Sequence, residues 1–273
     1  FQAEDGIRDV ERSRGLGDVY KRQGRDSSPQ MIETAIEGSL QRLKTDYIDV
    51  YMIHRPDTRM PIEETLRALD DLVRQGKILY TAGCNFEAWR FVDAYRTSEA
   101  GGLTTFAGSQ FAYSMMARGA EAEMIPACRQ LGVSIIPYLP LAAGFLTGKV
   151  GADGLVPQGT RLAIEHQMAE RWITPNNLEL VRRLEEWSQD RGRTILDLSF
   201  AWLLAEPSVA TVIAGASSRG QVKHNASASS WRLTPKDRID VTAIIDTYPP
   251  ENSGSYFSTA EYFHQPTQAA ARP

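Results

Sequence analysis

The sequence predicts an α/β protein whose strands form a parallel sheet. From Gly24 onward, short apolar runs rich in β-branched and aromatic residues alternate with longer segments whose apolar residues recur at helical spacing. Helices that connect successive strands make right-handed crossovers and leave neighbouring strands parallel. A chain of 273 residues is long enough for one α/β barrel or for two smaller domains.

The first half of the chain gives the clearest alternation. Ser28–Pro29 combines a helix cap with proline at the first helical position, and the helix is predicted to continue to Leu43. The run YIDVYMI (47–53) is a predicted strand. Another helix is predicted from Pro61 to Gln75, because Gly76 is a typical residue after a helix end. The following elements are strand 78–82, helix 87–96, strand 105–109, helix 120–131 and strand 133–137.

A long loop interrupts the second half. The segment Lys149–Ile173 is polar and contains glycine, and a loop of this length is more often functional or mobile than structural filler. After it we expect helices at 178–189, 194–204, 221–228 and 236–247 and a strand at 209–214. These elements make roughly five strand–helix units, whereas a closed (β/α)8 barrel of the TIM type uses about eight. The predicted fold is therefore a partial TIM (β/α)8 barrel, roughly its last five units, with exposed sheet edges that predict instability or aggregation.

Both ends of the chain are expected to differ from the rest. Residues 2–9 are what a DNA string like a sequencing flow-cell primer encodes, and residues 13–23 are encoded by a string that resembles a transposase adapter. We therefore expect 1–23 to be a non-native, adapter-derived segment, a charged disordered tail being the alternative. The barrel fragment is assigned to 24–248. The tail 249–273 is rich in Pro, Ser, Gln and Ala, which predicts loose order.

Composition excludes several classes of function. The net charge of −4 and the absence of a basic run argue against nucleic acid or an anionic membrane as a partner. The longest apolar runs are far shorter than the ~20 residues of a membrane-spanning helix. Two cysteines are too few for a disulfide framework, which favours a cytoplasmic location. The four histidines lack metal-ligand spacing, so no metal site is expected.

Polar or aromatic residues and one glycine directly follow the predicted strands. Functional groups of a parallel barrel gather at the carboxyl ends of its strands, so these residues are predicted to line one mouth. A lone histidine at a strand end is more often structural, but the set together favours a ligand site. The set consists of His54, Cys84 with Asn85, Gln110, Tyr138 and Gly215.

Four ordered segments resemble the aldo-keto reductase family. The segment EGSLQRLKTDYIDVYMIHRPD (37–57) resembles the family signature in which a histidine closes the fourth strand. The segments AGCNF (82–86), YLPLAAGFLTGK (138–149) and IAGASSRGQVKHN (213–225) agree in the same order. The resemblance covers nearly all of 24–248 and implies NADPH-dependent reduction of a small aldehyde or ketone.

The resemblance also implies a role for each matching residue. His54 would donate a hydrogen bond to the substrate carbonyl. Asn85, with Cys84, and Gln110 would hold the nicotinamide carboxamide, and Tyr138 would stack on the ring. The remaining cofactor residues would be the Pro140–Leu141 backbone and Lys149 beside the pyrophosphate, Arg161 near the phosphates, and Gly215, Ser217, Gln221 and Asn225 around the adenosine and its 2′-phosphate. With Arg219, these cations favour NADP over NAD.

Some positions depart from the family pattern. Cys84 stands where serine is usual, and Leu139 replaces the serine of a YSPL segment. His224 stands where glutamate is frequent, which removes an acceptor for the adenine amino group. We expect these changes to tune affinity. The family's proton-donating tyrosine, with its lysine and aspartate, precedes the helix that begins near Pro29, and Tyr20 and Lys21 lie in the adapter-like segment. The chain as printed is therefore expected to lack reductase activity.

Two other functions stay open on the sequence. A non-catalytic NADP-binding regulatory subunit, like the potassium-channel β subunits of the same fold, would use the same cofactor residues. A different TIM-barrel enzyme, such as an isomerase, fits less well, because an Asn85–Gln110–Tyr138 set suits a nicotinamide better than a sugar phosphate. The sequence does not determine the carbonyl substrate or the oligomeric state.

Overall fold

The computed structural model describes residues 26–151 and 153–253 of the chain. In this part of the chain four strands form one parallel sheet, in the order in which they occur in the sequence. The strands are β1 (Ile48–Ile53), β2 (Ile78–Cys84), β3 (Phe106–Ala112) and β4 (Ser134–Tyr138). The predicted parallel α/β arrangement is confirmed. That this sheet belongs to a closed (β/α)8 barrel stays a prediction.

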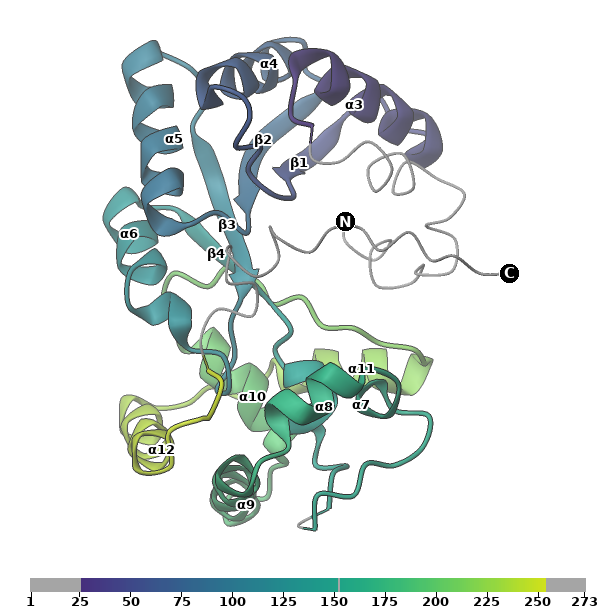
Figure 1. The fold of residues 1–273 in the computed structure, drawn as a ribbon, viewed down its shortest axis with the longest axis vertical. Coiled ribbons are helices and arrows are strands. Elements are labelled where there is room, and N and C mark those ends of the chain that lie inside the picture. The colour runs from purple at the N-terminus through teal and green to yellow at the C-terminus, as the bar shows by residue number, and fades with distance from the viewer. Residues whose placement is uncertain (1–25, 152, 254–273) are drawn as a thin grey trace.

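Four helices connect the strands or precede them, and they lie along one side of the sheet (Figure 1). They are α3 (Pro29–Leu43), α4 (Ile62–Arg74), α5 (Ala88–Gly101) and α6 (Met124–Leu131). The predicted helix 120–131 begins later than expected, because the 3₁₀ helix η1 (Gly119–Glu121) precedes α6. Helix α5 continues past the predicted 96 and ends where Gly102 adopts the left-handed conformation.

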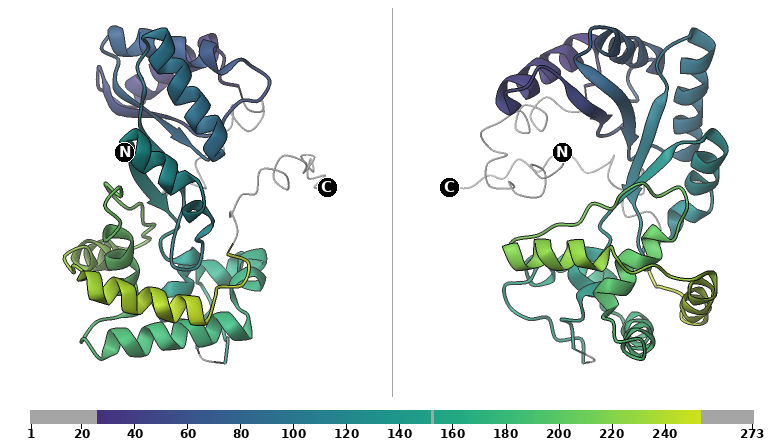
Figure 2. Two further views of the ribbon diagram at one scale, coloured as in Figure 1. Left: turned by 90° about the vertical axis from the view of Figure 1, so that its left-hand side faces the viewer. Right: turned by 180° about the vertical axis from the view of Figure 1, so that it is seen from behind.

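The second half of the chain is a group of helices beyond the end of β4 (Figures 1 and 2). It contains the 3₁₀ segment η2 (Ala142–Thr147) and the helices α7 (Arg161–Ile164), α8 (His166–Trp172), α9 (Pro175–Gln189), α10 (Ile195–Leu204), α11 (Arg219–Ala228) and α12 (Pro235–Thr247). The expectation of an unbroken loop at 149–173 was wrong, because α7 and α8 lie in it. Leu162, Met168 and Trp172 are buried there and supply the apolar contacts that a loop would lack.

Helices α10 and α12 begin with the same polar arrangement. Thr194 caps α10, with Thr194 N and Oγ1 both donating to Asp197 Oδ2, while Asp197 N donates to Thr194 Oγ1. Thr234 and Asp237 make the same three bonds at α12. Each of these capping boxes satisfies backbone N–H groups that the first turn would otherwise leave without a partner.

The fifth predicted strand, 209–214, is not a regular strand. It meets β4 at two isolated bridges, Ile135 with Val209 and Tyr138 with Ile213. Its backbone bonds to β4 are Ile135 N to Ser208 O (2.7 Å), Ala210 N to Ile135 O (3.1 Å) and Ile213 N to Pro137 O (2.8 Å). Pro137 has no N–H to donate in return, and one residue more separates 210 from 213 than separates 135 from 137. The prediction of five strands is corrected to four strands and one bulged segment beside β4.

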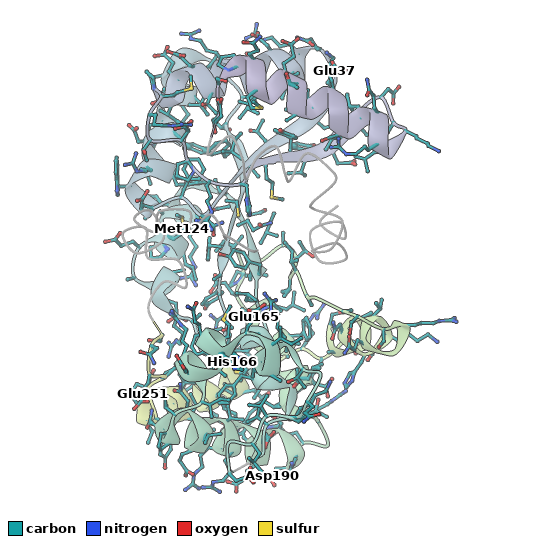
Figure 3. The ribbon with its side chains drawn as sticks, turned by 45° about the vertical axis from the view of Figure 1, so that its right-hand side comes forward. Glu37, Met124, Glu165, His166, Asp190 and Glu251 are labelled. Carbon is teal, nitrogen blue, oxygen red and sulfur yellow. The ribbon has the colours of Figure 1, made fainter. Side chains whose placement is uncertain are left out.

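The segment after α12 is held by side chains of α8 and α9. Asn177, fully buried, donates from Nδ2 to Glu251 O (3.4 Å) and accepts at Oδ1 from Glu251 N (2.8 Å). Asn252 Nδ2 donates to Arg171 O (3.1 Å), and Arg171 Nη2 donates to Asn252 O (2.6 Å). Figure 3 shows Glu251 beside the lower helices. Glu251 and Asn252 are therefore bonded to α8 and α9. The loose order expected of 249–273 stays a prediction, and 254–273 and the adapter-like 1–23 lie outside the described residues.

Candidate functional site

Four side chains predicted at strand ends are joined by hydrogen bonds. Tyr138 Oη donates to Asn85 Oδ1 at 2.6 Å, and Asn85 Nδ2 donates to Cys84 Sγ at 3.1 Å. Cys84 Sγ in turn donates to Gln110 Oε1 at 3.0 Å. Parallel strands in sequential order place their carboxyl ends at one edge of the sheet, so β2, β3 and β4 bring these residues together. We call Cys84, Asn85, Gln110 and Tyr138 the amide cluster.

His54 lies at the same edge. It directly follows β1, and its carbonyl oxygen accepts a hydrogen bond from Asn85 Nδ2 at 3.2 Å. Its imidazole is exposed. The end of β1 is therefore tied to the amide cluster, and a ligand held by the cluster would have an imidazole within its surroundings.

The deeper part of the amide cluster is buried. Cys84 is 1% exposed and Gln110 is 4% exposed. Gln110 Nε2 also donates to the sulfur of Met52 on β1, at 3.3 Å. These contacts fix the orientation of the Gln110 amide and leave Asn85 and Tyr138, which are half-buried, toward the outside.

Left-handed backbone is concentrated at the strand ends. Among the described residues, six that are not glycine have positive φ; two of them directly follow β2 and β4, and two more open η2, which comes shortly after β4. These four are Asn85 (φ 56), Leu139 (φ 56), Ala142 (φ 46) and Ala143 (φ 60). Leucine and alanine adopt this conformation at a cost of about 1–2 kcal/mol each, and such residues cluster at functional sites. The turn that carries Pro140, buried, and Leu141, half-buried, is thus strained where the pyrophosphate was predicted to pass.

The predicted phosphate-binding cations Lys149 and Arg161 lie on the surface, between η2 and α7 and at the start of α7. Lys149 is exposed and follows η2. Arg161 opens α7 and forms an ion pair with Glu165, with Nε 2.9 Å from Oε1. Figure 3 shows Glu165 and His166 at the junction of α7 and α8. Arg161 is half-exposed, so its guanidinium remains accessible to solvent.

The predicted adenosine residues form a second small network. Gln221 Oε1 accepts from Ser217 N at 2.6 Å and from Ser217 Oγ at 3.0 Å. Asn225 Nδ2 donates to Gly215 O at 3.4 Å. Ser218 caps α11 by accepting from Gln221 N, so this helix begins at Arg219, two residues before the predicted 221. The structure therefore brings Gly215, Ser217, Gln221 and Asn225 together at one helix N-terminus.

Comparison with known proteins decides the family. Residues 17–246 match the aldo/keto reductase family. The chain belongs to the aldo/keto reductase family. The match begins at residue 17, inside the segment expected to be non-native, and the boundary at Gly24 stays a prediction.

Relatives of this aldo/keto reductase carry two kinds of name. A probable voltage-gated potassium channel subunit beta of Oryza sativa subsp. japonica is 31% identical over 227 residues, 81% of this chain and 69% of the relative. The versiconal hemiacetal acetate reductase of Aspergillus parasiticus is 31% identical over 235 residues, 86% of this chain and 66% of the relative. The uncharacterized oxidoreductase YrpG of Bacillus subtilis (strain 168) is 32% identical over 218 residues, 80% of this chain and 64% of the relative.

The site residues of this family member suit a nicotinamide dinucleotide by their chemistry. A carboxamide offers donors and an acceptor, and the amides of Asn85 and Gln110 offer the same groups in return. Lys149 and Arg161, together with the N-terminal turn of α11, are the kinds of group that bind phosphates. Apart from Gly215 and its two chain neighbours, no described residue has a heavy atom within 4 Å of a Cβ built on Gly215, so this face of the turn is open.

Three residues near the site were not identified from the sequence. Met52 supplies a sulfur acceptor to Gln110. Glu185 lies beside Gly148, because its Oε1 would be 3.0 Å from a Cβ added to that glycine, and burial raises the pKa of Glu185. Asp197 lies beside His224, with Oδ1 3.7 Å from Nε2. These contacts join residues far apart in the sequence, and no local pattern announces them. Among the described residues, no cluster of three or more His, Cys, Asp or Glu could hold a metal ion, and no helix is long and apolar enough to cross a membrane.

Proposed function

We propose that the amide cluster holds the nicotinamide end of NADPH and that the site serves the reduction of aldehydes or ketones to alcohols. The observation that carries this is the hydrogen-bonded set of Tyr138, Asn85, Cys84 and Gln110 at the ends of consecutive strands. Rigid amides fixed in one orientation suit recognition of a carboxamide, and an aromatic ring beside them suits stacking on a flat heterocycle. The protein is proposed to act in the cytoplasm.

The chain's own residues would bind and orient the reactants. NADPH, when bound, supplies hydride. His54, exposed at the end of β1, would donate a hydrogen bond to the substrate carbonyl and hold it beside the ring that Tyr138 supports. Lys149, Arg161 and Arg219 would neutralise the phosphates. Because NADP carries an additional 2′-phosphate, this set of cations would bind NADP more tightly than NAD.

We further propose that the 273-residue polypeptide itself does not reduce carbonyls. The reaction needs a proton from a group with a lowered pKa, and in the family a tyrosine with a nearby lysine and aspartate provides it. The family resemblance matches no residue of 24–273 to these three positions. His54 alone would orient a carbonyl without replacing the acid.

A second function is favoured by the names of two relatives. Probable voltage-gated potassium channel β subunits of Oryza sativa subsp. japonica and Arabidopsis thaliana are 31% and 33% identical to this chain. A regulatory subunit that binds NADP without turnover would use the same amide cluster. Specific binding of this chain to the cytoplasmic part of a voltage-gated potassium channel would support this second function.

Fluorescence titration of the purified chain with NADPH and NADH tests the first function. We expect saturable binding of NADPH, tighter than that of NADH, and at least a tenfold loss of NADPH affinity in Asn85→Ala. Lys236→Ala, which removes an exposed cation of α12 paired with Asp240, serves as the control and should bind as the wild type does. Wild-type protein that binds neither dinucleotide contradicts the proposal. NADPH-dependent reduction of 4-nitrobenzaldehyde by the chain contradicts the proposed inactivity.

A further inference from the structure

We propose that Asp197 on α10 fixes the tautomer of His224 on α11, and that His224 then recognises the 6-amino group of adenine in the bound dinucleotide. This inference rests on the proposed function, because it assumes that the adenosine end of the cofactor lies at α11. It adds a specificity-determining pair in which one partner comes from a neighbouring helix.

The two carboxylate oxygens of Asp197 have different neighbours: Oδ2 is held by Thr194, and Oδ1 faces His224. Its Oδ2 accepts from Thr194 N at 2.9 Å and from Thr194 Oγ1 at 2.8 Å in the capping box of α10. Its Oδ1 lies 3.7 Å from His224 Nε2, a distance in the range of an ion pair and too long for a direct hydrogen bond. The Asp197 side chain is 13% exposed and the His224 side chain is 49% exposed, so the carboxylate backs a ring that faces solvent.

A carboxylate on one side of a neutral imidazole selects one tautomer. The hydrogen is favoured on Nε2, because the positive end of that N–H bond then faces Asp197 Oδ1. Nδ1 consequently keeps its lone pair and is an acceptor. Adenine presents its 6-amino group as a donor, so His224 in this tautomer and adenine have complementary groups.

The rest of the predicted adenosine site makes such an acceptor useful. Gln221 Oε1 already accepts two hydrogen bonds from Ser217. The sequence of α11, RGQVKHNASA, contains no acidic residue, and its charged side chains are Arg219 and Lys223. Asp197 therefore brings to this helix a negative charge that α11 itself lacks, and it does so beside His224.

The tautomer can be measured without any ligand. Nitrogen-detected NMR of ¹⁵N-histidine-labelled protein should show His224 with its hydrogen on Nε2, the signal being assigned by its loss in His224→Gln. In Asp197→Asn, the side-chain oxygen keeps the bonds to Thr194 and the amide N–H faces the ring, so the hydrogen should move toward Nδ1. Asp237→Asn is the matched control, because Asp237 has the same capping-box role at α12. An unchanged tautomer in Asp197→Asn overturns the proposal.

Binding of two dinucleotides tests recognition. The probes are NADPH and its deamino analogue, in which a carbonyl oxygen replaces the 6-amino group. The wild type should prefer NADPH by about two- to tenfold, the worth of one hydrogen bond. Asp197→Asn should lose or reverse this preference, His224→Gln should reduce it, and Asp237→Asn should keep it.

The outcomes separate the two proposals. Equal affinity of the wild type for both dinucleotides overturns the adenine-reading role and leaves the proposed NADPH function in place. Wild-type protein that binds neither dinucleotide overturns the proposed function and this inference with it. Circular dichroism of each variant reports whether the loss of a capping carboxylate has disturbed the fold, and His224→Gln leaves both capping boxes intact.

Discussion

Replacing Asn85 by alanine is the sharpest test of how the amide cluster is built. The side chain accepts from Tyr138 and donates to the His54 carbonyl and to Cys84 Sγ. The two bonds to oxygen-bearing partners contribute about 0.5–1 kcal/mol each in a half-buried position, and the bond to sulfur contributes less. Alanine at φ 56 adds a left-handed cost of about 1 kcal/mol. The expected loss is therefore about 2–3 kcal/mol of unfolding free energy.

Asn85→Gly separates the two contributions. Glycine removes the same side-chain hydrogen bonds but adopts positive φ without a Cβ penalty, so it should be about 1 kcal/mol more stable than Asn85→Ala. Urea unfolding followed by circular dichroism gives both values, provided the dependence on urea is unchanged. If alanine and glycine destabilise equally, or glycine destabilises more, the left-handed turn is not a source of strain here. NADPH affinity should fall equally in both variants, because it depends on the amide.

Three further predictions concern stability. Lys44→Gly should stabilise the protein by about 0.5–1 kcal/mol in thermal unfolding, because Lys44 follows α3 with φ 55, whereas Lys44→Ala should give no gain. Burial raises the pKa of Glu206, but its bonds to Arg129 and Arg238 outweigh burial, so the pKa is lowered overall. The ionised Glu206 carboxylate therefore stabilises the fold above the pKa of the unfolded state, and this stabilisation is lost as the pH falls through the pKa of the folded state. Glu206→Gln should thus cost about 2 kcal/mol at pH 7 and much less near pH 3 in thermal melts. Asn177→Ala should cost about 2–3 kcal/mol and speed proteolysis after α12, since the Glu251 backbone loses both bonds; unchanged proteolysis would contradict this.

The sequence predicted the elements whose signal is local. Helix α3 begins at the expected Pro29, because the cap and the proline are adjacent residues. Strand β1 and helix α4 also lie within a residue or two of their predicted bounds, because apolar periodicity defines each of them. The meeting of Asn85, Gln110 and Tyr138 could be predicted as well, since parallel strands in sequential order must end at one edge.

The features that were missed depend on contacts between distant segments. The run 209–214 has the composition of a strand, but its regularity depends on its partner, and Pro137 of β4 lacks the N–H that a continuous ladder requires. Helix α8 was hidden in a polar stretch, because its helicity rests on burying Met168 and Trp172 against other helices. The proximity of Asp197 to His224 follows from the packing of α10 on α11, which no spacing in the sequence encodes.

The strained conformation of Asn85 has a geometric reason. Neighbouring parallel strands lie about 4.8 Å apart, so the ends of β2 and β4 are separated by about 10 Å across β3. In the left-handed conformation Asn85 still donates its backbone N–H to Gln110 O at 2.9 Å, and its side chain reaches the Tyr138 hydroxyl. An extended residue at this position would continue the direction of β2 and carry the amide away from β4. The left-handed turn at Asn85 thus closes the amide cluster, and its backbone strain lies at the position where a carboxamide would bind.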